Sequence, residues 1–130
     1  MELLKTIHIT FGERILPLLI VIAAIWFTIV WKPGSPTNRA ARLFPVLVDI
    51  QFTLGLIMWI WGIVRGAGVV YLAWPFILHP IFGLISVGVA HMSVIPNGPF
   101  SRFGRWGVLV GLVLLLISVA IAIALAMTVG

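Results

Sequence analysis

Four long apolar stretches, separated by polar breaks, dominate the hydrophobic pattern of the chain. They cover residues 15–31, 43–64, 72–95 and 107–129. Each is close in length to the stretch of about 20 residues that a helix needs to cross the hydrocarbon core of a bilayer. None alternates apolar and polar residues as a strand of a membrane barrel does. The pattern therefore predicts an all-α integral membrane protein whose single domain, residues 1–130, is a bundle of four transmembrane helices.

Polar segments rich in glycine and proline interrupt these stretches and predict the turns of the chain. They lie at residues 32–42, 65–68 and 96–106. Because the connections are short, we expect consecutive helices to run antiparallel, which places both termini on one side of the membrane. Pro75 and Pro80 both disturb the first turns of the third helix.

The composition supports lipid as the solvent of this chain. Of its 130 residues, 62% are hydrophobic and only 8% are charged, and the mean hydropathy is +1.26. A soluble domain of this size needs more polar surface. The formal charge of +5 lies on short loops, which fits contact with anionic lipid headgroups and gives no reason to expect a nucleic-acid partner. The lack of cysteine excludes disulfides and iron–sulfur ligation.

The distribution of basic residues predicts an orientation. Five basic residues lie in or next to the two loops opposite the termini: Lys32, Arg39, Arg42, Arg102 and Arg105. Three lie on the side of the termini: Lys5, Arg14 and Arg65. Cytoplasmic loops carry an excess of Lys and Arg. We therefore expect a multi-pass protein of a bacterial inner (plasma) membrane with both termini outside.

Two of the three histidines lie in one apolar segment, Val69–Pro96, whose other ionisable side chain is Tyr71. Polar groups at bilayer depth are costly, so His79 and His91 are functional candidates. In membrane proteins a buried neutral imidazole ligates haem or a chlorophyll-type pigment, or contacts protons or a quinone.

Depth in the membrane favours His79 and His8 as a pair. His79 lies about 7 residues, roughly 10 Å, from the terminal side of its predicted helix, and His8 precedes or begins the first helix on the same side. Two imidazoles on opposite faces of a porphyrin hold a b-type haem. Gly83 and Ser86 follow His79 on its own face, where small residues leave a flat groove for a porphyrin or let helices pack closely. The alternatives are a structural role for His79 and a place in headgroup water for His8.

His91 belongs to a second predicted site. It follows His79 by twelve residues, so the two are separated by roughly 18 Å and about 120° around the helix and do not ligate one metal. Asp49 and Gln51 are expected on the same side of the membrane, at a similar depth. His91 is then a partner of Asp49, a quinone contact or a secondary metal-ligand candidate. We predict a quinone or proton site formed by His91, Asp49 and Gln51.

The segments LVDIQFTLGLIMW (Leu47–Trp59) and LHPIFGLISVGVAHM (Leu78–Met92) resemble a family of small four-helix bacterial membrane proteins described as cytochrome b-like. Gln51 and Gly55, with the histidine-containing helix after them, also resemble half of a haem A synthase or of a b561-type bundle. The resemblance implies haem b as the cofactor. It implies three haem-ligand candidates: His79, His91 and His8.

The sequence supports two functional hypotheses. The first is a b-type cytochrome-like electron-transfer protein, with haem b on His79 and His8 and a quinone or another redox partner near His91. The second is a non-catalytic accessory subunit of a respiratory or photosynthetic membrane complex, in contact with lipid, quinone, a chlorophyll-type pigment or other membrane subunits. The chain shows no carboxylate pair, no nucleophile with a base and no phosphate loop, so we expect no independent catalytic activity.

Overall fold

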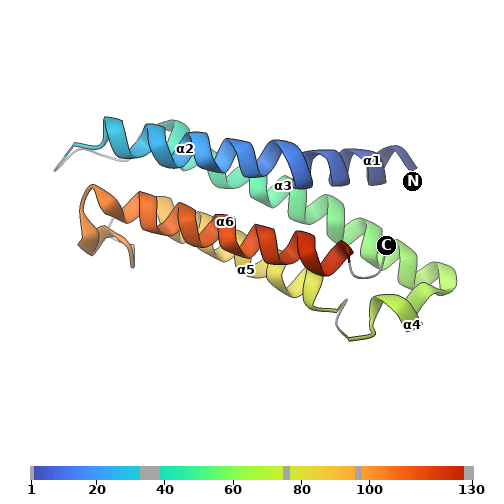
Figure 1. Ribbon diagram of the computed structural model, residues 1–130. Coiled ribbons are helices and arrows are strands. Elements are labelled where there is room, and N and C mark those ends of the chain that lie inside the picture. Colours follow the sequence, from blue (N-terminus) through green and yellow to red (C-terminus); the bar gives the residue numbers. More distant parts are fainter. Residues whose placement is uncertain (1, 33–38, 75–76, 96–97, 128–130) are drawn as a thin grey trace.

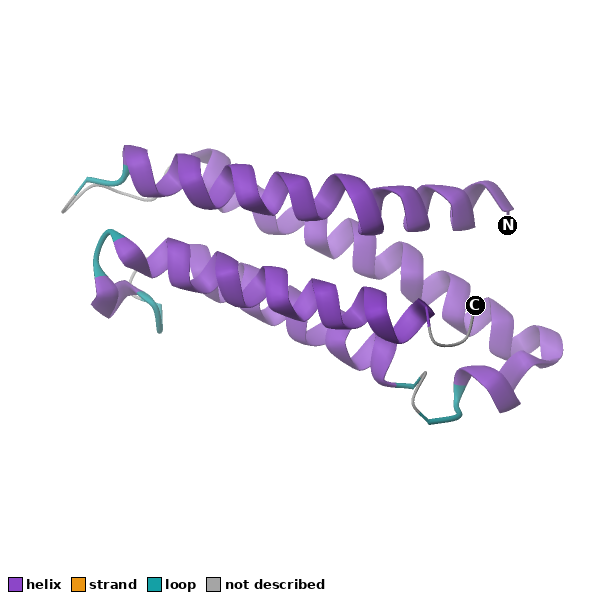
Figure 2. Ribbon diagram, viewed as in Figure 1, coloured by secondary structure: helices purple, strands orange, loops and turns teal. Residues whose placement is uncertain are grey.

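The computed structural model describes residues 2–32, 39–74, 77–95 and 98–127. All regular secondary structure in these ranges is helical (Figure 2). The elements are α1 (Glu2–Thr10), η1 (Phe11–Ile15), α2 (Leu16–Val30), α3 (Arg39–Gly62), η2 (Ile63–Ala67), α4 (Gly68–Tyr71), α5 (Leu78–Val94), η3 (Ser101–Phe103) and α6 (Trp106–Met127).

The first helix is longer than the predicted span at 15–31. α1, η1 and α2 follow one another without a break, and η1 is a π-helical turn in which the Leu16 N–H bonds to the carbonyl of Phe11, five residues earlier. Pro17 explains the wider turn, because it has no N–H and its ring clashes with the carbonyl four residues before it. The consequence is that His8 lies on the same helix as the first apolar stretch.

The third predicted helix, at 72–95, starts later than expected. α5 begins at Leu78, and the short α4 precedes it; residues 75 and 76 lie outside the described ranges. Pro80 is the third residue of α5, inside the first turn, where its missing N–H breaks no helical hydrogen bond. A helix that started at 72 would have held Pro80 in its interior. The break expected at 65–68 is present, since Gly66 has a φ of 95°.

Within the described ranges, three helices are long and apolar enough to cross a membrane: Glu2–Val30, Ala41–Gly66 and Trp106–Met127. α5 is also apolar but has only 17 residues. The path of the chain reverses between α2 and α3, between α3 and α5, and between α5 and α6, and both termini lie at the same end (Figure 1). The predicted helix at 107–129 agrees with α6 as far as Met127, beyond which the residues are not described.

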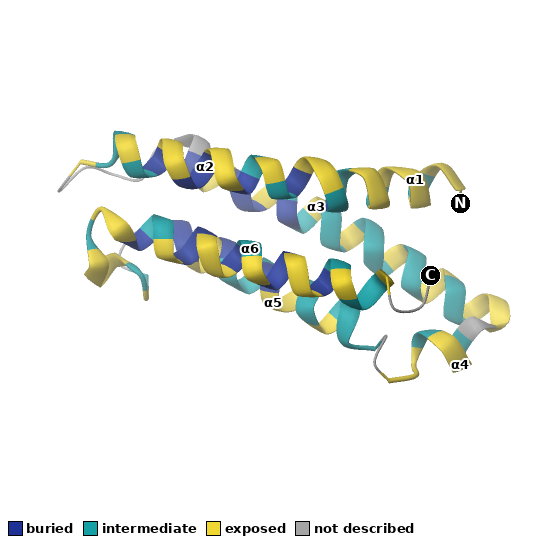
Figure 3. Cartoon of the chain, in the orientation of Figure 1, coloured by how far each residue is buried: buried dark blue, intermediate teal, exposed yellow. Residues whose placement is uncertain are grey.

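The packed core lies toward the end of the molecule opposite the termini. α1 contributes no buried residue, whereas buried residues line α2, the first half of α3, α5 and α6 (Figure 3). Gly111 allows the close approach of α5 to α6, because it faces Ser93 of α5, and Gly107 lies against the carbonyl of Phe100, which precedes η3. The outer faces are apolar as well, with Leu18, Ile29 and Ile117 more than half exposed, as expected for a surface in contact with lipid.

Candidate functional site

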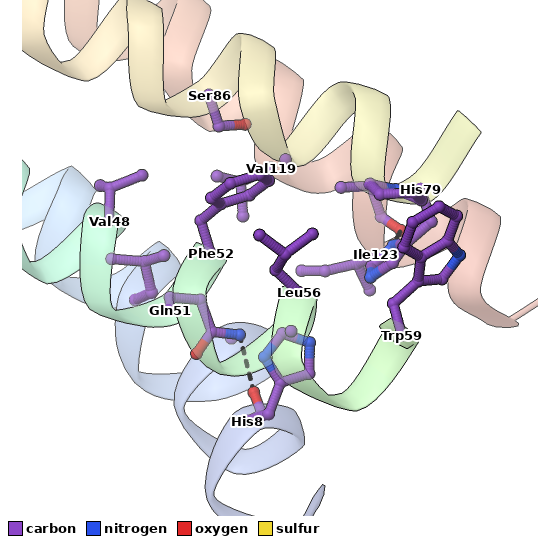
Figure 4. A pocket seen from close by; sticks show the side chains of 16 residues that line it. His8, Val48, Gln51, Phe52, Leu56, Trp59, His79, Ser86, Val119 and Ile123 are labelled. Atoms are coloured by element: carbon purple, nitrogen blue, oxygen red, sulfur yellow. Dashed lines mark hydrogen bonds between the residues drawn. The ribbon is translucent and has the colours of Figure 1, made fainter. Parts of the chain in front are cut away.

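A cavity opens where the buried core ends, between the first helix, α3, α5 and α6. Its volume is about 580 Å³, within the roughly 300–1,000 Å³ of typical ligand pockets. A smaller hollow adjoins it toward the core, and Figure 4 shows the side chains that line this hollow. Both spaces share the following lining residues: His8, Gly12, Gln51, Gly55, Trp59, His79 and Ile123.

His8 and His79 meet at this cavity. Their ring centroids lie 6.3 Å apart and their planes are almost perpendicular, at 87°. His8 comes from α1, and His79 is the second residue of α5, so the two rings approach from different helices (Figure 4). The structure therefore brings together the two histidines whose depths matched in the sequence.

A hydrogen bond to α6 fixes the tautomer of His79. Its Nδ1 lies 2.6 Å from the carbonyl oxygen of Ala122. A carbonyl only accepts, so Nδ1 is the donor, and the lone pair of the neutral ring is on Nε2. Metal-ligating histidines commonly donate their other ring N–H to a carbonyl in this way. The backbone of α6 thus holds His79 in a form that can ligate a metal.

The surroundings of His8 leave its ring close to α3. Gly55 makes room for it, because a Cβ at this position would lie 2.6 Å from His8 Cε1. The Gln51 amide donates to the His8 carbonyl over 2.8 Å (Figure 4), and Gly12 provides the space for that amide. Among the described residues, neither His8 Nδ1 nor Gln51 Oε1, both buried, has a hydrogen-bond partner. A buried polar atom without a partner costs about 1–3 kcal/mol, so these two atoms call for a physical reason, such as a bound water or ion.

The donor set fits one kind of metal centre. Two imidazoles that held one metal would have ring centres roughly 6 Å apart, and the observed separation is 6.3 Å. Both ring nitrogens of His8 lie beside Gly55, so its ring would have to turn toward His79 to share a metal. The described residues contain no group of three or more His, Cys, Asp or Glu side chains that could hold an ion. A closed zinc site needs four protein ligands, whereas haem brings four nitrogens of its own and needs only axial ligands. His8 and His79 therefore suit haem better than a bare ion.

The sequence predicted one site formed by Gln51, His91 and Asp49, but Gln51 does not lie with the other two. It contacts His8 instead, because successive helix residues turn by about 100° and a step of two places Gln51 roughly 200° from Asp49. Asp49 does meet His91, whose Nε2 lies 2.9 Å from both carboxylate oxygens. The two side chains are 37% and 47% exposed, respectively, and neither lines the cavity at His8.

The small residues that follow His79 on its helix face are Gly83 and Ser86. They contribute to side-chain packing more than they leave an open groove. Gly83 faces Phe52, whose Cδ2 would lie 3.0 Å from an added Cβ. Ser86 is buried, and its hydroxyl donates to the carbonyl of Phe82. Both residues line the smaller hollow, but the Phe52 ring occupies the space that a porphyrin was expected to take along this face.

Reading the sequence for histidines missed Gly12, Trp59 and Lys5, which also line the cavity. For Gly12 and Trp59, a spacing of four residues was the sequence signal that could have identified them. Gly12 follows His8 by four, and Trp59 follows Gly55 by four, so each shares a helix face with a residue of the site. Lys5 precedes His8 by three residues and shares its helix face too, but a cation near a helix end is usually only solvated.

Comparison of the chain with models of protein families, with characterised proteins and with solved structures gave no match. The role of the protein is therefore inferred from its own residues. The two imidazoles and the cavity beside them are the features that bear on this most directly.

Proposed function

We propose that the chain is a b-type cytochrome of the membrane, which holds one haem b through His79 and His8 and transfers single electrons. The observation that carries this proposal is the meeting of two imidazoles from different helices, 6.3 Å between ring centroids, beside a cavity of about 580 Å³.

The proposal includes four membrane spans in an antiparallel bundle. α5 rises about 25 Å at 1.5 Å per residue, somewhat less than the about 30 Å of a hydrocarbon core. Apolar Ile77 and Ile95 flank its ends, and α5 packs closely against α6, a helix long enough to cross. The excess of basic residues on the loops opposite the termini supports termini outside a bacterial inner membrane.

Each residue of the site has a proposed role. His79, oriented by the carbonyl of Ala122, would hold the haem iron. His8 would hold it as well, and Gly55 leaves the space for its ring. Lys5 lines the larger cavity, where its ammonium group suits the carboxylates that a porphyrin carries. When bound, haem supplies the one-electron chemistry, and the protein sets its ligands, burial and charge environment.

An optical spectrum of the purified chain, produced with haem available, tests the proposal. We expect a Soret band that shifts on reduction with dithionite and that disappears in His79→Ala. Leu84→Ala is the matched control, because Leu84 lies on the same helix and is 60% exposed; its spectrum should equal that of the native chain.

Other spectra would contradict the proposal in distinct ways. Extracted magnesium pigment would assign the two histidines to a chlorophyll-type cofactor. A colourless chain that co-purifies stoichiometrically with a large membrane complex would favour the accessory-subunit hypothesis. An unchanged Soret band in His79→Ala would show that the haem is held elsewhere.

A further inference from the structure

His91 and Asp49 form an ion pair on the outer surface between α5 and α3. The Nε2–H of His91 donates to the carboxylate, at 2.9 Å from both oxygens. Their side chains are 47% and 37% exposed, and apolar Ile50 and Met92, the residues that follow them in the chain, are exposed too. The pair is therefore a polar spot on a surface that is otherwise suited to lipid.

The pair lies within the apolar length of both helices. His91 precedes the end of α5 by three residues, roughly 5 Å, and Asp49 follows the start of α3 by ten residues, roughly 15 Å. Ionisable groups at membrane depth face protein, water or a ligand, because hydrocarbon solvates them poorly. We therefore expect a half-exposed pair at this depth to be covered by another molecule on the lipid side.

The chemistry of the pair restricts the nature of that molecule. With Nε2–H committed to the carboxylate, Nδ1 of His91 accepts a hydrogen bond when the ring is neutral and donates one when it is protonated. The negative charge of Asp49 disfavours a phospholipid phosphate. A water-soluble ligand does not approach from the hydrocarbon. A neutral, lipid-soluble molecule with hydroxyl or carbonyl oxygens can form a hydrogen bond with Nδ1, is not repelled by Asp49, and can approach through the hydrocarbon.

Open space beside His91 gives such a molecule a place to bind. Gly88 lies three residues before His91, on the same face of α5. A Cβ added to Gly88 would meet nothing within 4 Å. The bare backbone at this position leaves room for a flat ring next to the imidazole.

We propose that His91, Asp49 and the space at Gly88 bind the head group of a hydroquinone or quinone that enters from the lipid phase. A hydroquinone hydroxyl donates to Nδ1 of His91, and a quinone carbonyl accepts from the same nitrogen when the ring is protonated. The twelve residues between His79 and His91 place this site roughly 18 Å along α5 from the proposed haem site. Binding here requires no haem, so the two proposals stand or fall separately.

Equilibrium binding of decyl-ubiquinol and of decyl-ubiquinone to the full chain in lipid nanodiscs tests this site, since the first donates to a neutral His91 ring and the second accepts from a protonated one. We expect saturable binding to the native chain. Asp49→Asn and His91→Phe should weaken it about tenfold or more, as for the loss of a hydrogen bond that involves a charged group. Gly88→Leu should weaken it similarly, because it fills the open space and removes no polar group. Met92→Leu, a volume-conserving change next to His91, is the control and should bind as the native chain does.

Circular dichroism and gel filtration of Gly88→Leu separate a blocked site from a misfolded chain. Gly88→Ala adds only one methyl group to the open space and should weaken binding less than Gly88→Leu. The proposal is overturned if the native chain shows no saturable binding. It is also overturned if a folded Gly88→Leu and Asp49→Asn both bind like the native chain, or if a partner subunit covers the pair in native membranes and excludes the quinone. A colourless chain that still binds decyl-ubiquinone at this site would contradict the haem proposal alone.

Discussion

At the scale of residues, the candidate site depends on positions without a side chain. His8 lies against Gly55, and the Gln51 amide lies against Gly12. An extra Cβ at either glycine would collide with these groups, so each glycine is needed for the observed position of the polar group beside it. Two buried polar atoms without a partner among the described residues, His8 Nδ1 and Gln51 Oε1, lie at the same place.

Gly55→Ala should disturb the haem site selectively. The new Cβ would lie 2.6 Å from His8 Cε1, which is closer than carbon atoms pack, so the ring must move. Overpacking of this kind typically costs about 1–3 kcal/mol. We expect a lower Soret absorbance per chain and a lower thermal midpoint in detergent. Gly88→Ala is the matched control, since its Cβ meets nothing within 4 Å; equal losses in both variants would contradict a specific role for Gly55.

The sequence predicts part of this arrangement. The approach of His8 and His79 follows from their similar depth at the end of the bundle that holds the termini. The different faces of Asp49 and Gln51 also follow from about 100° per residue. Which face meets which partner does not follow, because the rotation of α3 about its axis is determined by packing against α1 and α5.

At the scale of elements, the π-helical turn η1 sets the direction in which His8 points. A π-turn adds one residue to an α-helix, so it rotates α1 by about 100° relative to α2. Pro17, the second residue of α2, makes the turn favourable. Apolar periodicity did not reveal the extra residue, because Glu13 and Arg14 within η1 place it outside the first apolar stretch, which begins at residue 15.

Pro17→Ala should remove the reason for the wider turn. If η1 then becomes α-helical, His8 rotates away from His79, and we expect most of the Soret band to be lost although the helix keeps its full hydrogen bonding. Deletion of Phe11 in the Pro17→Ala background removes the extra residue and should restore the band. An unchanged spectrum in Pro17→Ala, together with a loss in the double variant, would contradict this account of η1.

At the scale of the whole molecule, the helices pack tightly at one end and leave a cavity at the other. The buried residues of α2, α3, α5 and α6 gather away from the termini, while α1 has none (Figure 3). Hydrophobic patterning predicts the all-helical class and three of the apolar helices. It did not predict the late start of α5, because its apolar residues begin before Leu78 and proline determines where the helix forms.

The orientation of the chain is testable because it has no native cysteine. Single cysteines at Lys5 and at Ser101 place a thiol near the N-terminus and in the loop before α6. We expect a membrane-impermeant maleimide to label Lys5→Cys from outside intact cells and to label Ser101→Cys only after lysis. The positive-inside distribution is the physical reason, and labelling with the opposite pattern would reverse the proposed topology.

The central claim is that His8 and His79 together hold one haem iron, and electron paramagnetic resonance of the oxidised protein tests it most directly. Two imidazole ligands are expected to give a low-spin ferric signal in the native chain. His8→Ala, which leaves His79 and its bond to Ala122 in place, should convert that signal to a high-spin one that exogenous imidazole returns to low spin. A low-spin signal that persists in His8→Ala without added imidazole would contradict the claim.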